Sequence, residues 1–291
     1  MPDTRRRYAP QLAPGQKAGT IIRPNAGIER EYRRRLLRLV DEMYASITWW
    51  IGVEYKKQAE KLESYNGIAA DASPAEAMRQ ALRKRMRQWE RRFNEGASSL
   101  AEWFAQTSLA AASGAVAHSV GSAAGVAASK IAARFKMTRA MNNSLASIVY
   151  ENTALIRSIP QKCMLEVEGL VMRAVRTGYD AGSLTDELER RFGVTRRRAE
   201  FISRDQCNKA TEALTRTRME EIGVEEAIWI HTSIGREPRS NHVAFHGRRF
   251  RLSEGLYDDN KYVQKHVQPG ELPNCYCTKR PVIAAYGDPA S

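Results

Sequence analysis

The residues best suited to chemistry lie in the last quarter of the chain. Between positions 231 and 277 the sequence gathers four of its five histidines and two of its four cysteines, namely His231, His242, His246, His266, Cys275 and Cys277. Two imidazoles four residues apart share one face of a helix, and two cysteines one residue apart can ligate one ion. His242, His246, Cys275 and Cys277 therefore predict a Cys2His2 set for a structural zinc, with His231 as a reserve ligand.

Two other interpretations of this cluster stay open. The spacing matches no standard zinc finger, so the histidines could lie on the surface beside two small buried thiols, and His266 is expected in solvent. A catalytic zinc would need an open coordination position and a carboxylate base, for which Glu237 is the only obvious candidate. A zinc-dependent nuclease or hydrolase is therefore the alternative function. The sequence contains no phosphate-binding loop, nucleophile elbow or HExxH motif, and we expect no catalysis.

The charge balance predicts a polyanionic partner. The chain has 46 Lys and Arg against 33 Asp and Glu, a formal net charge of +13 and a pI near 9.8. The excess lies in residues 1–40 and 79–92, which could also be solvated helix faces. Because no base-reading element is recognisable, we expect sequence-independent binding of double-stranded DNA. The candidate DNA-binding residues are Arg5, Arg6, Arg7, Arg33, Arg34, Arg35, Arg83, Lys84, Arg85 and Arg87.

Apolar periodicity predicts a mainly α protein: an elongated helical body followed by a small α+β C-terminal module, which zinc could staple. Helices are expected from Ile28 to Tyr65 and from Pro74 to about Asn94, with Pro160 starting another helix and Gly193 ending a short one. The predicted regions are a basic flexible arm (1–27), a helical N-terminal region (28–144), a helical domain (145–223), the α+β module (224–285) and a tail (286–291).

The segment 103–129 carries no formal charge and is rich in Ala, Gly and Ser. Gly121 and Gly125 have the spacing that lets two helices approach closely, so tight packing or a homo-oligomer is favoured. Weak hydropathy and the internal His118 argue against a resident transmembrane helix. Conditional membrane contact is the minority interpretation. The N-terminus is basic but lacks the apolar stretch of a secretory signal.

Several motifs in series resemble the Mu F-like minor head proteins of tailed bacteriophages, the head-morphogenesis family. The order and spacing agree over about residues 145–285, in the stretches 152–160, 198–206, 239–242, 247–250 and 274–277, together with Gly223 and Trp229. The resemblance implies that His242, Cys275 and Cys277 belong to the family's module.

The same resemblance implies a minor capsid protein, made in the host cytoplasm and carried in the virion inside the capsid near the portal. Its expected partners are the portal protein, other head proteins and packaged DNA, and its expected role is head assembly and DNA packaging or ejection. An ejected protein that contacts the host membrane is the remaining alternative.

Overall fold

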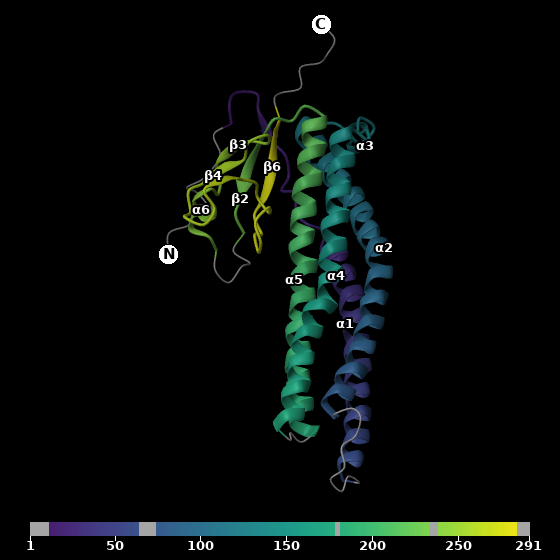
Figure 1. Cartoon of the computed structure of the whole chain (residues 1–291). Helices are drawn as coiled ribbons and strands as arrows, with labels where there is room; N and C mark the ends of the chain where they lie inside the picture. Colours follow the sequence, from purple (N-terminus) through teal and green to yellow (C-terminus); the bar gives the residue numbers. More distant parts are fainter. Residues whose placement is uncertain (1–11, 64–73, 178–180, 233–237, 284–291) are drawn as a thin grey trace. The chain divides into compact units, whose positions relative to one another are not determined.

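A computed structural model describes residues 12–63, 74–177, 181–232 and 238–283 (Figure 1). The mainly α fold class with a small strand-containing C-terminal region is confirmed. The helices are α1 (Ala26–Glu63), α2 (Pro74–Ala124), α3 (Ala128–Ala132), α4 (Arg139–Thr177), α5 (Ala181–Glu221) and α6 (Ser240–Ala244). The strands are β1 (Lys17–Ala18), β2 (Glu226–Ile230), β3 (Arg249–Arg251), β4 (Leu256–Asp258), β5 (Lys265–Val267) and β6 (Thr278–Ile283).

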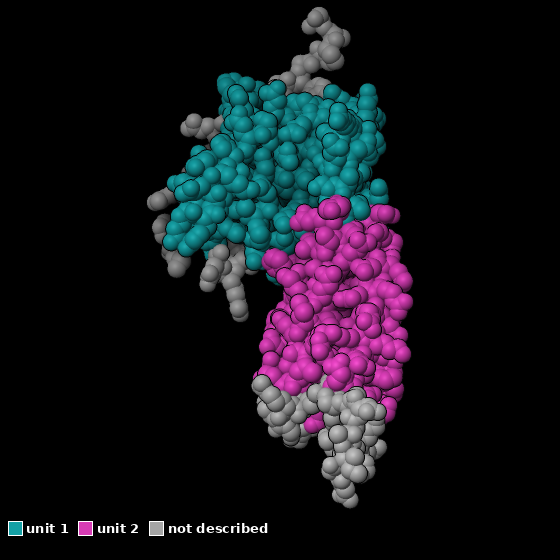
Figure 2. Space-filling model, viewed as in Figure 1, with its two compact units in different colours: residues 1–29, 103–149, 204–291 teal, residues 30–102, 150–203 magenta. Residues whose placement is uncertain are grey.

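The chain divides into two compact units, coloured separately in Figure 2. Unit 1 comprises residues 1–29, 103–149 and 204–291, and unit 2 comprises residues 30–102 and 150–203. These ranges differ from the predicted boundaries at 144 and 223, because α1, α2, α4 and α5 each contribute residues to both units. The predicted regions each consist of consecutive residues, whereas the observed units combine helix segments that are distant in the chain.

Unit 2 is built from segments of these four long helices. The buried residues of α1 recur at spacings of three and four, which places them on one stripe: Tyr32, Leu36, Val40, Met43, Ile47 and Ile51. These spacings repeat every eleven residues, close to the period of an α-helix, and so keep one apolar stripe along its length for packing against other helices. The buried face of α1 therefore follows from the apolar pattern of its sequence.

The helices run longer than predicted, and three expected boundaries were wrong. The chain stays helical through Asn94 in α2, Pro160 in α4 and Gly193 in α5. Around Gly193 the buried positions continue on one face with Leu188, Phe192, Thr195 and Ala199. Glycine costs a helix interior only about 1 kcal/mol relative to alanine, which the burial of one continuous face outweighs.

Unit 1 contains an antiparallel sheet in the order β1-β6-β2-β3 and a separate hairpin of β4 and β5. In the central pair, Glu226 lies opposite Val282 and Ile230 lies opposite Thr278. The register brings the end of β2, which leads into His231, next to the start of β6, which follows Cys277.

Lys17, Ala18 and Ile22 pair with this sheet, which differs from their predicted place in a flexible arm. Lys17 and Ala18 pair with Ile283 and Val282, and Ile22 forms a further bridge with Lys279. Ile22 is buried in the core. A composition rich in Pro and Gly is typical of a flexible segment. The strand has only two residues, which is too short to leave an apolar pattern in the sequence. Residues 1–11, including Arg5, Arg6 and Arg7, lie outside the described residues.

The uncharged segment packs inside unit 1, as expected. Val116, Ala117, Val120 and Ala123 join one buried cluster with residues of the sheet. Gly121 has a different role from the predicted helix–helix approach: a Cβ there would lie 2.8 Å from the carbonyl oxygen of Val126, where the chain turns back on the end of α2. Among the described helices, none combines the length and apolar character needed to cross a bilayer.

Candidate metal centre

The histidines and cysteines of the C-terminal module meet in unit 1. His231 directly follows β2, His242 lies on α6, and Cys275 and Cys277 lie in the loop that leads into β6. The ring of Trp229 packs edge-on against His242, with ring centres 5.2 Å apart, and also contacts Phe245 and Phe250. This aromatic packing holds α6 on the sheet and turns His242 into the interior.

Three of the four predicted ligands form one compact group. The side-chain ligand atoms of His242, Cys275 and Cys277 all lie within 4.8 Å of one another. Nδ1 of His242 is 3.3 Å from Sγ of Cys275 and 3.7 Å from Sγ of Cys277. The exposed fractions are 2% for His242, 3% for Cys275 and 6% for Cys277. This group is buried and offers one nitrogen and two sulfurs to a single point.

His231, named as the reserve ligand, lies beside this group, and His246 does not join it. Nδ1 of His231 is 3.6 Å from Sγ of Cys277. His246 follows the end of α6 at Ala244, so the helical spacing that would align it with His242 does not apply. Instead its Nδ1 accepts a hydrogen bond from the backbone N–H of His231 at 3.1 Å.

Asp258 is a residue of the site that the sequence reasoning missed. Its Oδ2 lies 3.3 Å from Nε2 of His242, a close contact that is not aligned as a full hydrogen bond. Both side chains are buried. Burial raises the pKa of Asp258, but hydrogen bonds from Asn241 and from the backbone N–H of Asn260 outweigh it, so the pKa is lowered overall. An ionised carboxylate therefore faces the outer nitrogen of His242.

Two residues close to His242 in the sequence, Asn241 and Arg239, make hydrogen bonds that position the parts of the site. Nδ2 of Asn241 donates to Oδ1 of Asp258 at 2.6 Å, and a guanidinium nitrogen of Arg239 donates to the carbonyl oxygen of Pro273 at 3.0 Å. The first contact fixes the carboxylate beside His242. The second ties the start of α6 to the loop that carries the cysteines.

Helix α5 anchors the cysteine loop from the other direction. The backbone N–H of Asn274 donates to Oδ1 of Asp205 at 3.0 Å, and Nδ2 of Asn208 donates to the carbonyl oxygen of Cys275 at 3.0 Å. The backbone N–H of Gly270 donates to Sγ of Cys275 at 3.4 Å. Asn274 adopts a positive φ of 57°, a conformation that asparagine tolerates better than most residues. The loop is thus held in a shape that points both sulfurs inward.

The two thiols share their protons unequally. The pKa of Cys275 lies well below its usual range, first because the thiol of Cys277 donates to its sulfur and also because His242 stabilises the thiolate. The pKa of Cys277 is raised because it donates that hydrogen bond and is buried beside the thiolate. Burial and the neighbouring His246 lower the pKa of His231. The site therefore favours a neutral His231 imidazole and a thiolate at Cys275, the forms that bind metals.

The remaining predicted members lie apart from this group. His266 is exposed on β5, where its ring packs against Tyr257 with centres 5.4 Å apart. Glu237, the candidate base of a catalytic zinc, falls outside the described residues. Cys163 and Cys207 are buried, and burial raises the pKa of both thiols, to about 11 and about 12, as expected for core residues.

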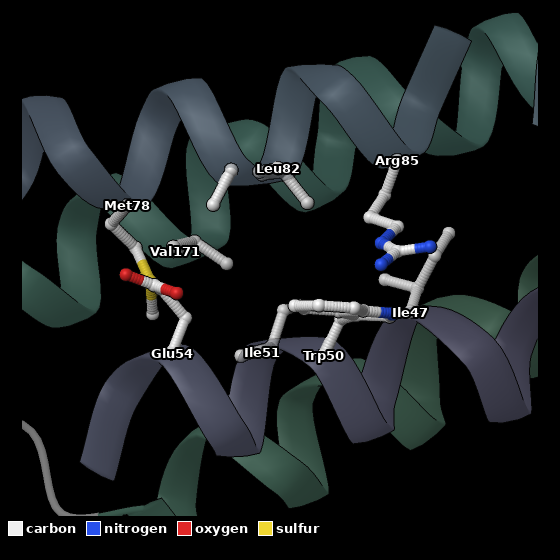
Figure 3. A pocket seen from close by; sticks show the side chains of 9 residues that line it. Ile47, Trp50, Ile51, Glu54, Met78, Leu82, Arg85 and Val171 are labelled. Carbon is white, nitrogen blue, oxygen red and sulfur yellow. The ribbon is translucent and has the colours of Figure 1, made fainter. Parts of the chain in front are cut away.

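Unit 2 carries the described members of the predicted DNA-binding set. Arg34 and Arg35 pair with Glu31 at 2.7 and 2.8 Å, and Arg83 pairs with Glu168 at 3.0 Å. Lys84 and Arg87 are exposed, and Arg33 is half-buried. Figure 3 shows Arg85 over the ring of Trp50, and its guanidinium carbon lies 3.5 Å from the ring centre.

An open groove gathers arginines of α1 and α2, and two of them were not in the predicted set. Arg34, Arg35, Arg38 and Arg92 line it with Glu42, and its volume is about 500 Å³. We refer to these four arginines as the arginine groove. Arg38 pairs with Glu42 at 3.0 Å, and Arg92 also contacts Glu42.

The candidate metal centre lies inside the part of the chain that matches a phage-protein family. Residues 165–280 match the family described as "Phage Mu protein F like protein". This match confirms the resemblance to Mu F-like phage head proteins over that part of the chain, and this family is one of structural head proteins. His231, His242, Asp258, Cys275 and Cys277 all lie within the matched range.

A curated relative is an uncharacterized protein of Haemophilus influenzae. It is 28% identical to this chain over 153 residues, which make up 53% of this chain and 32% of the relative. The chain thus spans about a third of the length of that relative. No solved structure matches the chain.

Proposed function

We propose that this chain is a minor capsid protein of a tailed bacteriophage that acts in head morphogenesis beside the portal and contacts packaged DNA. The match of residues 165–280 to the Mu F-like family carries the first part of the proposal. The fold supports it, because His242 and both cysteines form one buried group, and the motif residues Arg239 and Asn241 hold the segments around it. Their contacts connect α6 with β4 and with the loop that carries the cysteines.

A structural role fits this centre better than the alternative of a zinc-dependent nuclease or hydrolase. Cys275, His242 and Asp258 have the order of a nucleophile, a base and an orienting carboxylate, and their contacts are both 3.3 Å. A catalytic nucleophile must reach its substrate, yet the exposed fractions of these side chains are 3%, 2% and 0%. Burial of this degree would also keep a substrate away from an ion held by these side chains, so the centre suits a structural role.

The arginine groove supplies the DNA-contacting surface in this proposal. Four guanidinium groups face two carboxylates, Glu31 and Glu42, so the local formal charge is 4 − 2 = +2. Each carboxylate orients two guanidinium groups and leaves further N–H donors for phosphate oxygens. Phosphate contacts of this kind carry little sequence information, so binding should be sequence-independent.

Particle analysis tests the head-protein assignment. In the phage or prophage that encodes the chain, mass spectrometry of full heads, empty heads and ejected material should find the chain in heads, and loss of the gene should reduce the yield of DNA-filled particles. Absence from purified heads would refute the assignment. Recovery in the ejected material would favour an ejected protein over one that stays beside the portal.

A salt titration tests DNA contact independently. Log affinity for duplex DNA should fall with log salt concentration by about 0.9 per phosphate neutralised. Arg34→Gln with Arg92→Gln should weaken binding and flatten this slope equally on unrelated duplexes. The matched control, Arg190→Gln with Arg197→Gln on α5, removes the same charge away from the groove. Equal losses in both variants would reduce the effect to net charge and exclude the arginine groove.

A further inference from the structure

We propose that His231, His242, Cys275 and Cys277 bind one zinc ion tetrahedrally, through Nδ1 of both histidines and Sγ of both cysteines. The sequence pattern alone favours His246 as the second imidazole. The inference goes beyond the head-protein assignment and does not depend on it.

The distances among the four side chains suit such a site. With zinc–sulfur bonds of about 2.3 Å and zinc–nitrogen bonds of about 2.0 Å, a tetrahedral arrangement separates a sulfur and a nitrogen ligand by about 3.5 Å. The three sulfur–nitrogen separations recorded here are 3.3, 3.6 and 3.7 Å, and they link the four side chains in one chain: Cys275, His242, Cys277 and His231. His231 touches only the Cys277 end of this chain of contacts and lies outside the group whose ligand atoms are all within 4.8 Å of one another, so its imidazole must move toward His242 and Cys275 for four ligand atoms to surround one ion.

The surroundings of the ligands are those of a metal centre. Metal-binding histidines usually turn their second ring nitrogen to a carboxylate or a carbonyl group. Nε2 of His242 faces Asp258, which Asn241 holds in place. The backbone N–H of Gly270 donates to Sγ of Cys275, which would stabilise thiolate charge. These contacts leave Nδ1 of His242 and both sulfurs directed at the shared centre.

The choice of zinc follows from the donor set. Two thiolates and two imidazoles in a tetrahedral arrangement select zinc among common biological divalent ions, whereas magnesium and calcium require oxygen ligands. Four protein ligands would leave no open position, which describes a structural rather than a catalytic site. The ligands come from three segments: the end of β2, α6 and the loop before β6. One ion would therefore connect segments that short strands alone hold weakly.

His246 has a positioning role in this arrangement. Because its Nδ1 accepts the backbone N–H of His231, it fixes the residue that would supply the fourth ligand. His246 itself is half-buried at the turn after α6. We therefore expect replacement of His246 to loosen the site without removing a ligand.

Cobalt substitution of the full chain tests the ligand set. After chelator treatment, titration with Co²⁺ should give one equivalent bound, with the intense visible bands of tetrahedral cobalt and thiolate charge-transfer absorption, and Zn²⁺ should displace it. His231→Ala should abolish the tetrahedral bands or weaken binding by at least about tenfold. His246→Ala should retain the bands. Asp258→Asn should keep the spectrum but lower zinc affinity by about 10–100-fold.

Two results would overturn the proposal. One is retention of both the tetrahedral bands and the cobalt affinity in His231→Ala, which would exclude His231 as a ligand; loss of the bands in His246→Ala would then make His246 the ligand. The other is the absence of stoichiometric metal in the untreated protein and in the cobalt titration. Since a ligand variant could fail to fold, X-ray absorption of the zinc-loaded unmodified chain provides a separate test: two sulfurs and two nitrogens support the site, and any other set contradicts it.

Discussion

The ammonium group of Lys279 lies 3.0 Å from both a carboxylate oxygen and the backbone carbonyl oxygen of Glu212, and both side chains are buried. This contact joins β6 to α5 beside the cysteine loop. Burial lowers the pKa of Lys279, and the neighbouring Glu212 opposes that shift. The pair is thus a charged connection whose two halves depend on each other.

Breaking this pair should cost more than removing it. Glu212→Leu leaves a buried ammonium group without its carboxylate, so we expect it to lower the free energy of unfolding by about 3–5 kcal/mol. Lys279→Met with Glu212→Leu should lose less than Glu212→Leu alone. Urea unfolding measures both. Glu254→Gln, in the exposed pair with Arg251, is the control and should change little. A double variant as unstable as the single one would contradict this.

A buried hydrogen bond in unit 2 gives a second prediction. The hydroxyl of Tyr32 donates to Oδ1 of Asn152 at 2.8 Å, and both residues are buried. Tyr32→Phe leaves that amide oxygen without this donor and should destabilise the protein by about 1–2 kcal/mol. Tyr150→Phe, at a side chain that is 81% exposed, is the matched control. Equal stability of the two variants in urea would show that the Tyr32 hydroxyl contributes nothing.

Two glycines of α2 should respond to alanine in opposite directions. A Cβ at Gly121 would lie 2.8 Å from a backbone oxygen, whereas a Cβ at Gly114 meets nothing within 4 Å. Gly114→Ala should stabilise by about 0.5–1 kcal/mol because alanine restricts the unfolded chain and favours helix. Gly121→Ala should destabilise by about 1–3 kcal/mol. Thermal and urea unfolding would test this, and a stabilised Gly121→Ala would rule out the close approach.

The carboxyl group of Glu31 should titrate at unusually low pH. Hydrogen bonds from Arg34 and Arg35 lower its pKa from 4.5 to about 2. Because the folded pKa lies below the unfolded value, any stabilisation from this group is complete above about pH 4.5 and is lost as the pH falls toward 2. NMR titration of Glu31 measures the midpoint, and Arg34→Gln with Arg35→Gln should raise it. A midpoint near 4.5 in the unmodified protein would exclude these contacts in solution.

The sequence predicted features that depend on local pattern. The helix expected from Ile28 to Tyr65 agrees with α1, because burial of one face imposes an apolar period on the chain. The grouping of His242 with Cys275 and Cys277 was also predicted, from residue types that are rare enough to stand out.

Sequence patterns did not predict the features that depend on where a helix ends or on contacts between residues far apart in the chain. The choice between His231 and His246 rests on α6 stopping at Ala244, and five-residue helices leave little periodic signal. Asp258 is one acidic residue among many, and only its packing against His242 distinguishes it. The strand at Lys17–Ala18 is invisible from sequence because its partner lies at the other end of the chain.

That distant partnership has a consequence for biosynthesis. Lys17 is translated well before its pairing partner, Ile283, because the two lie far apart in the sequence. The sheet of unit 1 therefore cannot be completed until β6 has been translated, and Ile22 and Trp229 lack part of their buried cluster until then. Contacts so far apart in sequence are slow to form and leave the nascent chain dependent on protection from aggregation. A chain interrupted before β6 would carry an open sheet edge, so quality control could recognise truncated copies before they meet an assembling particle.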